Sequence, residues 1–388
     1  MKREIHVILV GDEPVANLTP CLDPAFAPGQ AVLVTPPDRR SEAEWLEAVL
    51  KPRGIHCSRW TVGDAYSVAG LRDRIFDLLA EREADADAGR LVLNATGGTR
   101  PMALAAYEVF RQFEQPVFYV NPLTDHLGWL YHPEHPKGAP STDLADRIKL
   151  GAFMTAHGAR VESTGAAEGV PKSLRALCDD LVEHVEELAR PLGTLNYLAS
   201  TAEGSLYSEE MGYSLRNAED LQALIRRFEA AGCVSRAGSR LVFPDEARRF
   251  FVCGGWLEAH VFGTVFGLRK QRPTLQDVGR GVQVARPVAG GDVRNEIDVA
   301  FLADNKLFVV ECKTACLDRG DAGSTALYKL DSIADVLGGA QARAMLVSFR
   351  PLKGYQQRRA AELGINVVSG SDLRRLSSRM LSWIPASS

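Results

Sequence analysis

The sequence predicts an α/β protein in which two larger α/β units are joined by a small connector. Three observations support this prediction. The N-terminal half alternates short apolar runs typical of strands with amphipathic stretches typical of helices. Residues 158–170 are rich in Gly, Ala, Thr and Glu and show no periodicity, which indicates a boundary. Toward the C-terminus, two apolar runs meet at Asp304-Asn305, which we interpret as a two-residue hairpin turn.

The N-terminal half reads as a parallel, Rossmann-like sheet. Helical spacing at 42–50 and 68–79 separates its strands, and Pro101 marks the start of a further helix. In such sheets ligands bind at the carboxyl ends of the strands, so the loops after the first and fourth strands are where we expect a site. The predicted strands are 5–10, 31–35, 55–60, 90–94 and 116–120.

The loop after the fourth strand has the composition of an anion site. Its two glycines allow the backbone to approach a phosphate, the helix N-terminus adds positive potential, and Thr96, Thr99 and Arg100 can donate hydrogen bonds. It matches neither the Walker A nor the dinucleotide-binding glycine motif, which argues against an ATPase or a dehydrogenase. The alternative is a glycine turn that only reverses the chain. With the loop after the first strand, the predicted ligand site comprises Gly11, Asp12, Asn17, Thr96, Gly97, Gly98, Thr99, Arg100 and Met102.

The C-terminal hairpin carries charges where two apolar strands should have none. Counting back from the turn places Asp298 opposite Glu311 and Glu296 opposite Lys313, all on one face. Ala300, Leu302, Leu307 and Val309 continue that face. The other face, which is also apolar, consists of Ile297, Val299, Phe301, Phe308, Val310 and Cys312. Both strands are therefore expected inside a sheet.

Facing buried carboxylates raise each other's pKa unless a cation lies between them, and oxygen ligands select Mg²⁺ or Mn²⁺. Lys313, on the same face as Glu311, can position or deprotonate a water or stabilise charge on a phosphate. This pattern predicts a metal-dependent nuclease centre. The alternative is a surface hairpin with a Glu/Lys pair.

The pattern Asp298-x12-Glu311-x-Lys313 resembles the PD-(D/E)xK nuclease superfamily, although Ile297 replaces the motif's proline. The resemblance extends to the segment 254–262, where Glu258 matches the helical glutamate that often completes the metal shell. It implies catalysis by Glu258, Asp298, Glu311 and Lys313, with Glu258, Asp298 and Glu311 holding Mn²⁺ or Mg²⁺.

The loop Thr96-Gly97-Gly98-Thr99-Arg100-Pro101-Met102 resembles the Thr-Gly-Gly-Thr-Lys-x-Met signature of CARF domains, the CRISPR-associated Rossmann folds that sense cyclic oligoadenylates. Arg100 replaces the commoner lysine and keeps the charge. Nearly the whole chain resembles the CARF-nuclease effectors of type III CRISPR systems. This implies a homodimer in which bound cyclic tetra-adenylate activates metal-dependent cleavage of DNA, and in some members RNA. The alternative function is a ligand-responsive DNA-binding regulator with a degenerate nuclease fold.

The connector contains a helical pattern at 171–192, a helix at 214–230 and a hairpin at 232–243, which together resemble a winged helix. We interpret it as a spacer rather than a DNA reader. A C-terminal α/β core is predicted from helices at 324–337 and 355–363 and strands at 344–349 and 365–368. The expected domains are a CARF sensor at 1–157, the connector at 158–247 and a PD-(D/E)xK nuclease at 248–388.

Composition excludes several classes. The 388 residues are 46% hydrophobic and 24% charged, with neither an 18-residue apolar run nor a signal peptide, so we expect a cytoplasmic protein without a membrane span. Seven cysteines without a C-x-x-C pair indicate reduced thiols. Because the net charge is −4, any binding of nucleic acid must come from local patches of basic residues. Basic candidates near the proposed centre are Arg248, Arg249, Arg269, Lys270, Arg272 and Arg280, with Lys329 and Gln341 as further neighbours.

Overall fold

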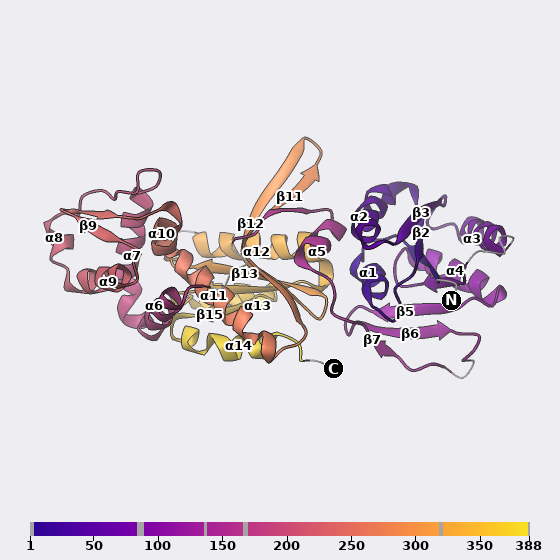
Figure 1. The fold of residues 1–388 in the computed structure, drawn as a ribbon. Helices are drawn as coiled ribbons and strands as arrows, with labels where there is room; N and C mark the ends of the chain where they lie inside the picture. Colours follow the sequence, from indigo (N-terminus) through magenta and orange to yellow (C-terminus); the bar gives the residue numbers. More distant parts are fainter. Residues whose placement is uncertain (1–3, 84–88, 136–137, 166–169, 318–320, 387–388) are drawn as a thin grey trace.

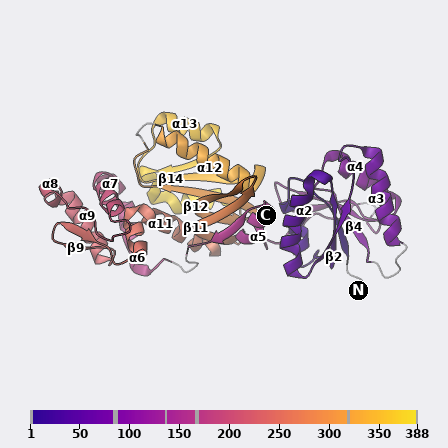
Figure 2. The same cartoon turned by 90° about the horizontal axis from the view of Figure 1, so that it is seen from above.

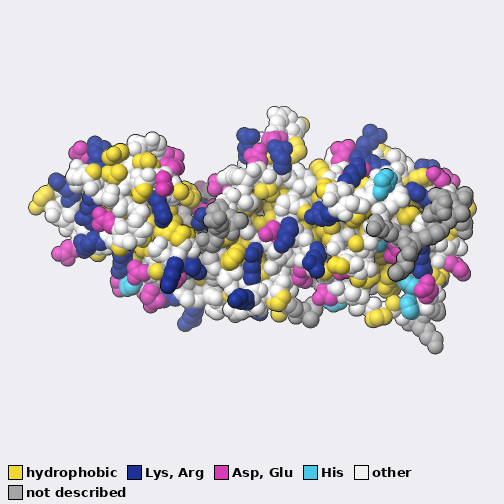
Figure 3. Space-filling model, in the orientation of Figure 1, with side chains coloured by type: hydrophobic (Ala, Val, Ile, Leu, Met, Phe, Trp, Pro, Cys, Tyr) yellow, Lys and Arg dark blue, Asp and Glu magenta, His cyan; other side chains and the backbone are white. Residues whose placement is uncertain are grey.

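The computed structural model describes residues 4–83, 89–135, 138–165, 170–317 and 321–386. Its parts lie in a row, with the N-terminal domain at one end, the C-terminal α/β domain in the middle and the connector at the other end (Figure 1). The connector therefore follows the N-terminal domain in sequence but not in space. Acidic and basic side chains are interspersed over the face shown in Figure 3, as the small net charge suggests.

The N-terminal domain has the predicted Rossmann-like fold. Its sheet contains β1 (Ile5–Leu9), β2 (Gln30–Thr35), β3 (His56–Thr61), β4 (Leu91–Asn94), β5 (Val117–Asn121), β6 (His126–Tyr131) and β7 (Thr142–Asp143). Its helices are α1 (Val15–Leu22), α2 (Arg40–Leu50), α3 (Val68–Glu83) and α4 (Arg100–Gln112). The strand order is β3-β2-β1-β4-β5-β6-β7, with β1 to β5 parallel. Figure 2 shows α3 and α4 on one face and α2 on the other. Because the order reverses between β1 and β4, the loops after these strands meet at one edge.

The C-terminal domain is a mixed sheet in the order β15-β14-β13-β12-β11-β8. The strands are β8 (Arg160–Ser163), β11 (Leu275–Val288), β12 (Gly291–Ala303), β13 (Lys306–Lys313), β14 (Arg343–Ser348) and β15 (Asn366–Ser369). The helices are α5 (Leu150–Ala156), α11 (Trp256–Gly267), α12 (Ala322–Gly338), α13 (Gly354–Glu362) and α14 (Leu376–Trp383). Every strand and helix predicted after the hairpin is confirmed. The long strand β11, which was not predicted, pairs with β12 along its length.

The connector contains α6 (Lys172–Glu183), α7 (Val185–Thr201), α8 (Tyr213–Arg216), α9 (Glu219–Ala230), β9 (Ser235–Ala237) and β10 (Arg240–Val242). The predicted helix and hairpin of the winged-helix pattern are present. The range expected for the connector begins with β8, which instead pairs with β11 in the nuclease sheet. Residues 166–169 of the predicted boundary lie outside the described part of the chain.

From the connector the chain returns through α10 (Glu246–Phe250) and the π-helix η3 (Phe251–Gly255) into α11. The continuous helical run Glu246–Lys270 is long and apolar enough to cross a membrane by length and composition alone. Packing explains this apolarity, because Trp256, Leu257 and Val261 are fully buried in the core that α11 shares with the connector and the sheet.

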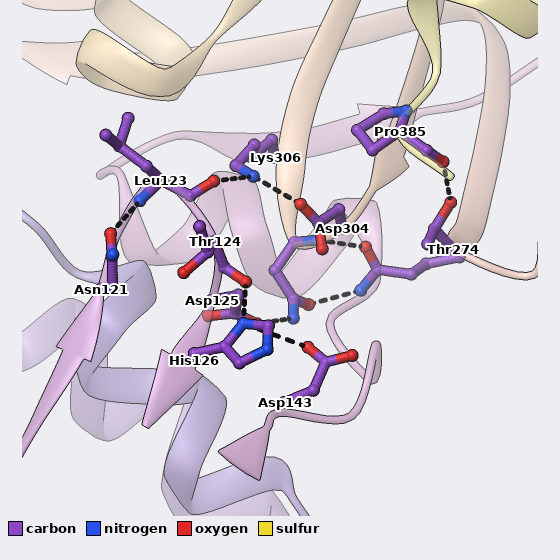
Figure 4. Close-up of polar contacts among 12 residues, drawn as sticks. Asn121, Leu123, Thr124, Asp125, His126, Asp143, Thr274, Asp304, Lys306 and Pro385 are labelled. Atoms are coloured by element: carbon purple, nitrogen blue, oxygen red, sulfur yellow. Dashed lines mark hydrogen bonds and ion pairs between the residues drawn. The ribbon is translucent and has the colours of Figure 1, made fainter. Parts of the chain in front are cut away.

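The two α/β domains contact each other at the turn of the β12–β13 hairpin (Figure 4). Asp304 and Asn305 form this turn with φ of 52° and 53°, as a two-residue turn between twisted strands requires. The Asn305 amide donates to Asp125 Oδ2 at 2.5 Å, and Lys306 Nζ donates to the Leu123 carbonyl oxygen at 2.7 Å. Both partners belong to the β5–β6 turn of the N-terminal domain, so this domain holds the turn of the β12–β13 hairpin in place.

The same junction is tied to β11 and to the apolar core. The Asn305 backbone N–H donates to Gln276 Oε1 at 2.8 Å, and Lys149 Nζ donates to the Gln276 carbonyl oxygen at 2.6 Å. Phe153 of α5 is buried in a core that contains residues from both α/β domains, including Leu46 of α2 and Leu307 of β13. Polar and apolar contacts therefore join the domains at one place.

Candidate active site and ligand cavity

The hairpin register predicted from the sequence is confirmed. Ala303 pairs with Lys306 and Val299 with Val310. Continuing this antiparallel pairing by one residue brings Asp298 opposite Glu311. The two carboxylates therefore come from neighbouring strands at the same level of the sheet.

The predicted face pattern fails one residue further along β12. Val299 is buried in the core beneath α11, but Ile297 and its partner Val282 are buried in the core on the other side of the sheet. Between Val282 and the partner of Val299, Gly281 has a φ of 54°. A left-handed residue in β11 rotates the strand pair locally, so strict alternation is lost there. The prediction that Ile297 shares the face of Val299 is therefore wrong.

Glu311 and Lys313 form the rigid part of the site. Glu311 is 5% exposed, and its Oε1 lies 2.5 Å from Lys313 Nζ. Asp298 Oδ2 accepts a hydrogen bond from the Cys312 backbone N–H at 2.7 Å. Burial, with a further contribution from the Glu311 carboxylate, raises the pKa of Asp298 to about 6, although Lys313 opposes the shift. Burial alone would lower the pKa of Lys313, but Glu311 and Asp298 raise it above its ordinary value, so the lysine is a cation at neutral pH.

Glu258 reaches the same electrostatic environment from α11. Burial raises its pKa to about 8, and the Asp298 and Glu296 carboxylates contribute to the shift, while Arg280 and Lys313 oppose it. The structure thus brings all four predicted catalytic residues into one interacting group. Glu296 pairs with Gln283 of β11 on the other side of β12, and its carboxylate also contributes to the raised pKa of Glu258.

The metal prediction is only partly matched by geometry. Within the described residues, no group of three His, Cys, Asp or Glu side chains is placed to hold a metal ion. The predicted set of Glu258, Asp298 and Glu311 is therefore not closed in this structure. After burial, the Asp298 carboxylate contributes to the raised pKa of Glu258, and the Glu311 carboxylate contributes to the raised pKa of Asp298, as expected for clustered carboxylates. A hard divalent cation would relieve this, and Mg²⁺ needs only one or two protein carboxylates when water and phosphate complete its shell.

The other predicted neighbours of the site divide into two groups. Lys329 of α12 lowers the pKa of Asp298 and so lies near it, as expected. Gln341 instead lines a small cavity at the domain interface. Arg249 is engaged with Glu246 and the Ala199 carbonyl oxygen. Arg272 donates to the carbonyl oxygens of Leu381 and Ile384. Of the basic cluster, Arg280 is the residue whose charge acts on Glu258.

At the carboxyl edge of the N-terminal sheet lies a cavity of about 440 Å³. Five of the residues predicted from the loops line it, namely Gly11, Asp12, Gly98, Thr99 and Arg100. The loops touch closely, because a Cβ on Gly11 would lie 2.6 Å from the Gly98 backbone nitrogen. Thr99 caps α4 by accepting from the Met102 backbone N–H at 3.3 Å, and its hydroxyl donates to the Ala65 carbonyl oxygen at 2.6 Å. The helix N-terminus and Arg100 therefore face a preformed site.

The remaining four predicted residues hold the loops in place. Asn17 is fully buried and donates to the Leu9 carbonyl oxygen at 3.2 Å. The Thr96 hydroxyl accepts from the Val120 backbone N–H at 2.8 Å. A Cβ on Gly97 would lie 2.2 Å from the Leu9 carbonyl oxygen, and the Met102 side chain is buried beside Gly98. Their role in this structure is packing beneath the ligand loops.

Sequence reasoning missed the cavity residues from the loops after β2 and β3, which are Pro36, Asp38, Arg39, Ala65 and Tyr66. Arg39 forms ion pairs with Asp12 and, at 3.0 Å, with Glu42. The signal was available, because all parallel strands end at the same edge of the sheet. The strand-end argument was applied to the first and fourth strands alone.

Each of the two α/β domains matches a known protein family. Residues 5–150 match the model of the Card1 CARF domain, and residues 245–387 match the Card1-like endonuclease domain. No curated protein sequence matches the chain. A crystal structure of protein VC1899 from Vibrio cholerae is similar at 34% identity and a TM-score of 0.89, covering 98% of both chains.

Two further structures share the fold at lower identity. Can2 from Sulfobacillus thermosulfidooxidans, solved in complex with cyclic tetra-adenylate, has 23% identity and a TM-score of 0.80. The alignment covers 99% of this chain and 100% of the Can2 chain. A type III CRISPR defence DNA nuclease activated by cyclic oligoadenylate has 17% identity and a TM-score of 0.58, covering 98% of this chain and 52% of its own. Taken with the domain matches and VC1899, these findings show that the chain belongs to the family of CARF nuclease effectors that join a Card1 CARF domain to a Card1-like endonuclease domain.

Proposed function

We propose that this protein is a metal-dependent endonuclease that cyclic tetra-adenylate activates by binding to its CARF domain. One observation carries the proposal: Glu258, Asp298, Glu311 and Lys313 converge at the end of a hairpin whose turn is held by the CARF domain. DNA is the proposed substrate, with single-stranded RNA as a second one. A homodimer, in which two CARF domains share one ligand, is the proposed assembly.

In the active centre, Asp298 and Glu311 would hold Mn²⁺ or Mg²⁺, with Glu258 completing the site from α11. When bound, the ion would make water more acidic and stabilise negative charge on the scissile phosphate. Lys313 is a fixed cation 2.5 Å from Glu311, so it orients the attacking water and balances charge that develops on the phosphate oxygens. Burial and the neighbouring carboxylates raise the pKa of Glu258 to about 8 in the absence of a cation, and a bound metal would favour its ionised, ligating form.

The ligand cavity supports an anionic nucleotide. The N-terminus of α4, the Gly98 backbone and Arg100 supply positive potential on one side, and the ring of Tyr66 offers a surface for a base on another. The Can2 structure holds cyclic tetra-adenylate, and on that basis we propose the same ring for this chain.

The hairpin turn provides the route from ligand to active centre. Asp125 and Leu123 of the CARF domain bind Asn305 and Lys306, and these residues begin the strand that ends in Glu311 and Lys313. A tilt of the CARF domain would therefore move β13 relative to α11, on which Glu258 lies. A change in the distances among the three carboxylates is then the activating step.

The test is cleavage of plasmid DNA by the full chain with Mn²⁺ and cyclic tetra-adenylate, each also omitted in turn. Cutting should require both. Glu311→Gln and Lys313→Ala should each lower the cleavage rate at least about 100-fold, as expected for loss of a group that stabilises transition-state charge, while calorimetry shows unchanged ligand affinity. Full cleavage by either variant, or cleavage without metal, would remove the proposed centre.

A further inference from the structure

The connector is fixed against the nuclease domain, at the end of the molecule remote from the CARF domain (Figure 1). Its helix α7 makes three hydrogen bonds to nuclease residues through backbone carbonyl oxygens. Arg350 donates to Ala189 at 2.6 Å, Arg249 to Ala199 at 3.0 Å, and the Cys253 thiol to Asn196 at 3.5 Å. The connector and the CARF domain thus lie at opposite ends of the molecule, with the nuclease domain between them. The connector is therefore not the link that carries a signal from the CARF domain to the active centre.

Between α7 and the end of the catalytic strand lies an open groove of about 710 Å³. One wall is formed by Arg190, Thr194 and Tyr197 of α7, and the other by residues 314–316 and Arg350. Residue 314 directly follows the catalytic Lys313, so the groove begins beside the active centre.

Contacts across the groove tie its two walls to the catalytic elements. The Asn196 amide and the Thr314 hydroxyl are hydrogen bonded at 2.9 Å. A Cβ on Gly254, in the π-helix before α11, would lie 2.4 Å from Thr314 Oγ1. Gly193 makes room for Arg350, whose Nη2 would lie 3.0 Å from an added Cβ. The walls of the groove are therefore packed closely against α7, the π-helix before α11 and the end of β13.

The chemistry of the groove fits a nucleic-acid strand. Among the described residues that line it there are two arginines and no carboxylate. Arg190 is exposed and has no ion pair with any described residue. Tyr197 is 55% exposed, so its ring is accessible to a base. Cations that follow a phosphate backbone, together with an aromatic surface for stacking, are the usual means of holding a single strand.

We infer that this groove guides one strand of the nucleic-acid substrate to the active centre, and that the connector is a substrate-binding part of the enzyme. The inference rests on the proposed nuclease function. Arg190 and Arg350 contact phosphates, and Tyr197 stacks on a base. These are positioning residues, because the groove lies beside the reacting phosphate rather than around it.

The experiment uses the full chain with Mn²⁺, cyclic tetra-adenylate and a fluorescently labelled single-stranded DNA of 20 nucleotides. Arg190→Ala and Tyr197→Ala should each raise KM about fivefold or more, because each removes one phosphate or stacking contact, and leave kcat within twofold. Arg190→Ala should also reduce the slope of log KM against log salt by about 0.7, the value for one single-strand phosphate contact. Tyr197→Phe keeps the ring and should behave as wild type.

The matched control is Arg226→Ala, which removes an exposed arginine of α9 that does not line the groove. Binding of the same DNA to Glu311→Gln protein, measured by anisotropy with and without Arg190→Ala, separates the groove from cleavage. Weaker binding in the Arg190 variant alongside no cleavage by wild type would support the groove and reject the nuclease proposal. Unchanged KM and binding in the Arg190 and Tyr197 variants of a cleaving enzyme would overturn the inference, as would an equal loss in Arg226→Ala.

Discussion

Asp125 lies at the domain interface with only 5% of its surface exposed. Burial raises its pKa to about 8, and the neighbouring Asp304 and Asp146 carboxylates add to the shift, although the Asn305 amide opposes it. Since the pKa in the unfolded chain is about 3.9, the folded state holds a proton that the unfolded state releases. The free energy of unfolding should therefore be highest at low pH and should fall as pH rises from about 4 through about 8.

Asp125→Asn, which is neutral at every pH, should remove the part of this dependence that Asp125 contributes, while the raised pKa values of Glu258 and Asp298 keep theirs. Between pH 6 and pH 9 the melting temperature of the wild-type protein should fall by about 2 °C or more beyond any fall in the variant. Asp73→Asn is the control, because Asp73 is exposed on α3. Calorimetric scans at both pH values measure the effect, and identical slopes for wild type and Asp125→Asn would show that Asp125 ionises normally.

At the scale of single residues, sequence spacing was sufficient to predict which side chains lie together wherever the backbone is regular. Asp298, Glu311 and Lys313 could be placed together because a two-residue turn fixes the register of both strands. Glu258 could not be placed by spacing, since it lies on a helix about 40 residues before the hairpin and its position depends on tertiary packing; it came from the family resemblance. Asn17 and Met102 were assigned to ligand binding, but the loop backbone needs them as buried supports.

At the scale of structural elements, the turn of the β12–β13 hairpin is the contact between the two domains that activation should depend on. Asn305 combines a φ of 53° with side-chain bonds to Asp125 and Gln276. Asn305→Gly keeps a residue that accepts this φ and removes the amide. Ligand affinity should be unchanged, but the cleavage rate with saturating cyclic tetra-adenylate should fall about tenfold, as expected for loss of about 1.4 kcal/mol of coupling. Single-turnover cleavage measures this.

The control for the turn is Ser239→Gly in the β9–β10 hairpin, where the change again removes a turn side chain without touching the domain interface. It should leave activation intact. A fully activated Asn305→Gly enzyme would show that the signal travels by another path.

The π-helix η3 brings Gly254 against the residue that follows the catalytic strand. Its φ is 127°, and an added Cβ would lie 2.4 Å from Thr314 Oγ1. Gly254→Ala should therefore destabilise the protein by about 1–3 kcal/mol, the usual range for such backbone strain, and lower cleavage by displacing Thr314. Gly263→Ala, on the same helical run with no neighbour closer than 4.0 Å, should be neutral or slightly stabilising. Urea unfolding of both variants compares them, and equal stability would show that η3 adapts at no cost.

The prediction of strands failed where polar residues and glycines interrupt the alternation of apolar and polar side chains. The strand β11 contains Asp277, Arg280, Gln283 and two glycines, one of which, Gly281, has a positive φ, so it lacks the alternation that marks a strand. It exists because β12 pairs with it along its length. In contrast the parts of β12 and β13 next to the turn, 299–303 and 307–310, are apolar, and the hairpin there was predicted correctly, although β12 begins four residues before the predicted Asn295.

At the scale of the whole molecule, sequence order misled the domain assignment. After the CARF domain, the chain first adds α5 and β8 to the nuclease domain, then builds the connector on the far side, and returns through α11. No local pattern shows this, because pairing of β8 with β11 joins residues that are 120 or more positions apart. The arrangement places the endonuclease domain between the CARF domain on one side and the connector on the other (Figure 1).

This arrangement predicts that ligand binding stabilises the molecule through the CARF cavity. At a ligand concentration of 100 times Kd, binding to the folded state alone adds about 2.7 kcal/mol, so cyclic tetra-adenylate should raise the melting temperature by several degrees. Arg100→Ala removes the exposed cation at the start of α4 and should abolish most of this rise together with activation. Arg111→Ala, at the other end of the same helix, should keep both. An unchanged melting shift in Arg100→Ala would exclude this arginine from the ligand site, and a shift without cleavage would place the defect in the coupling between domains.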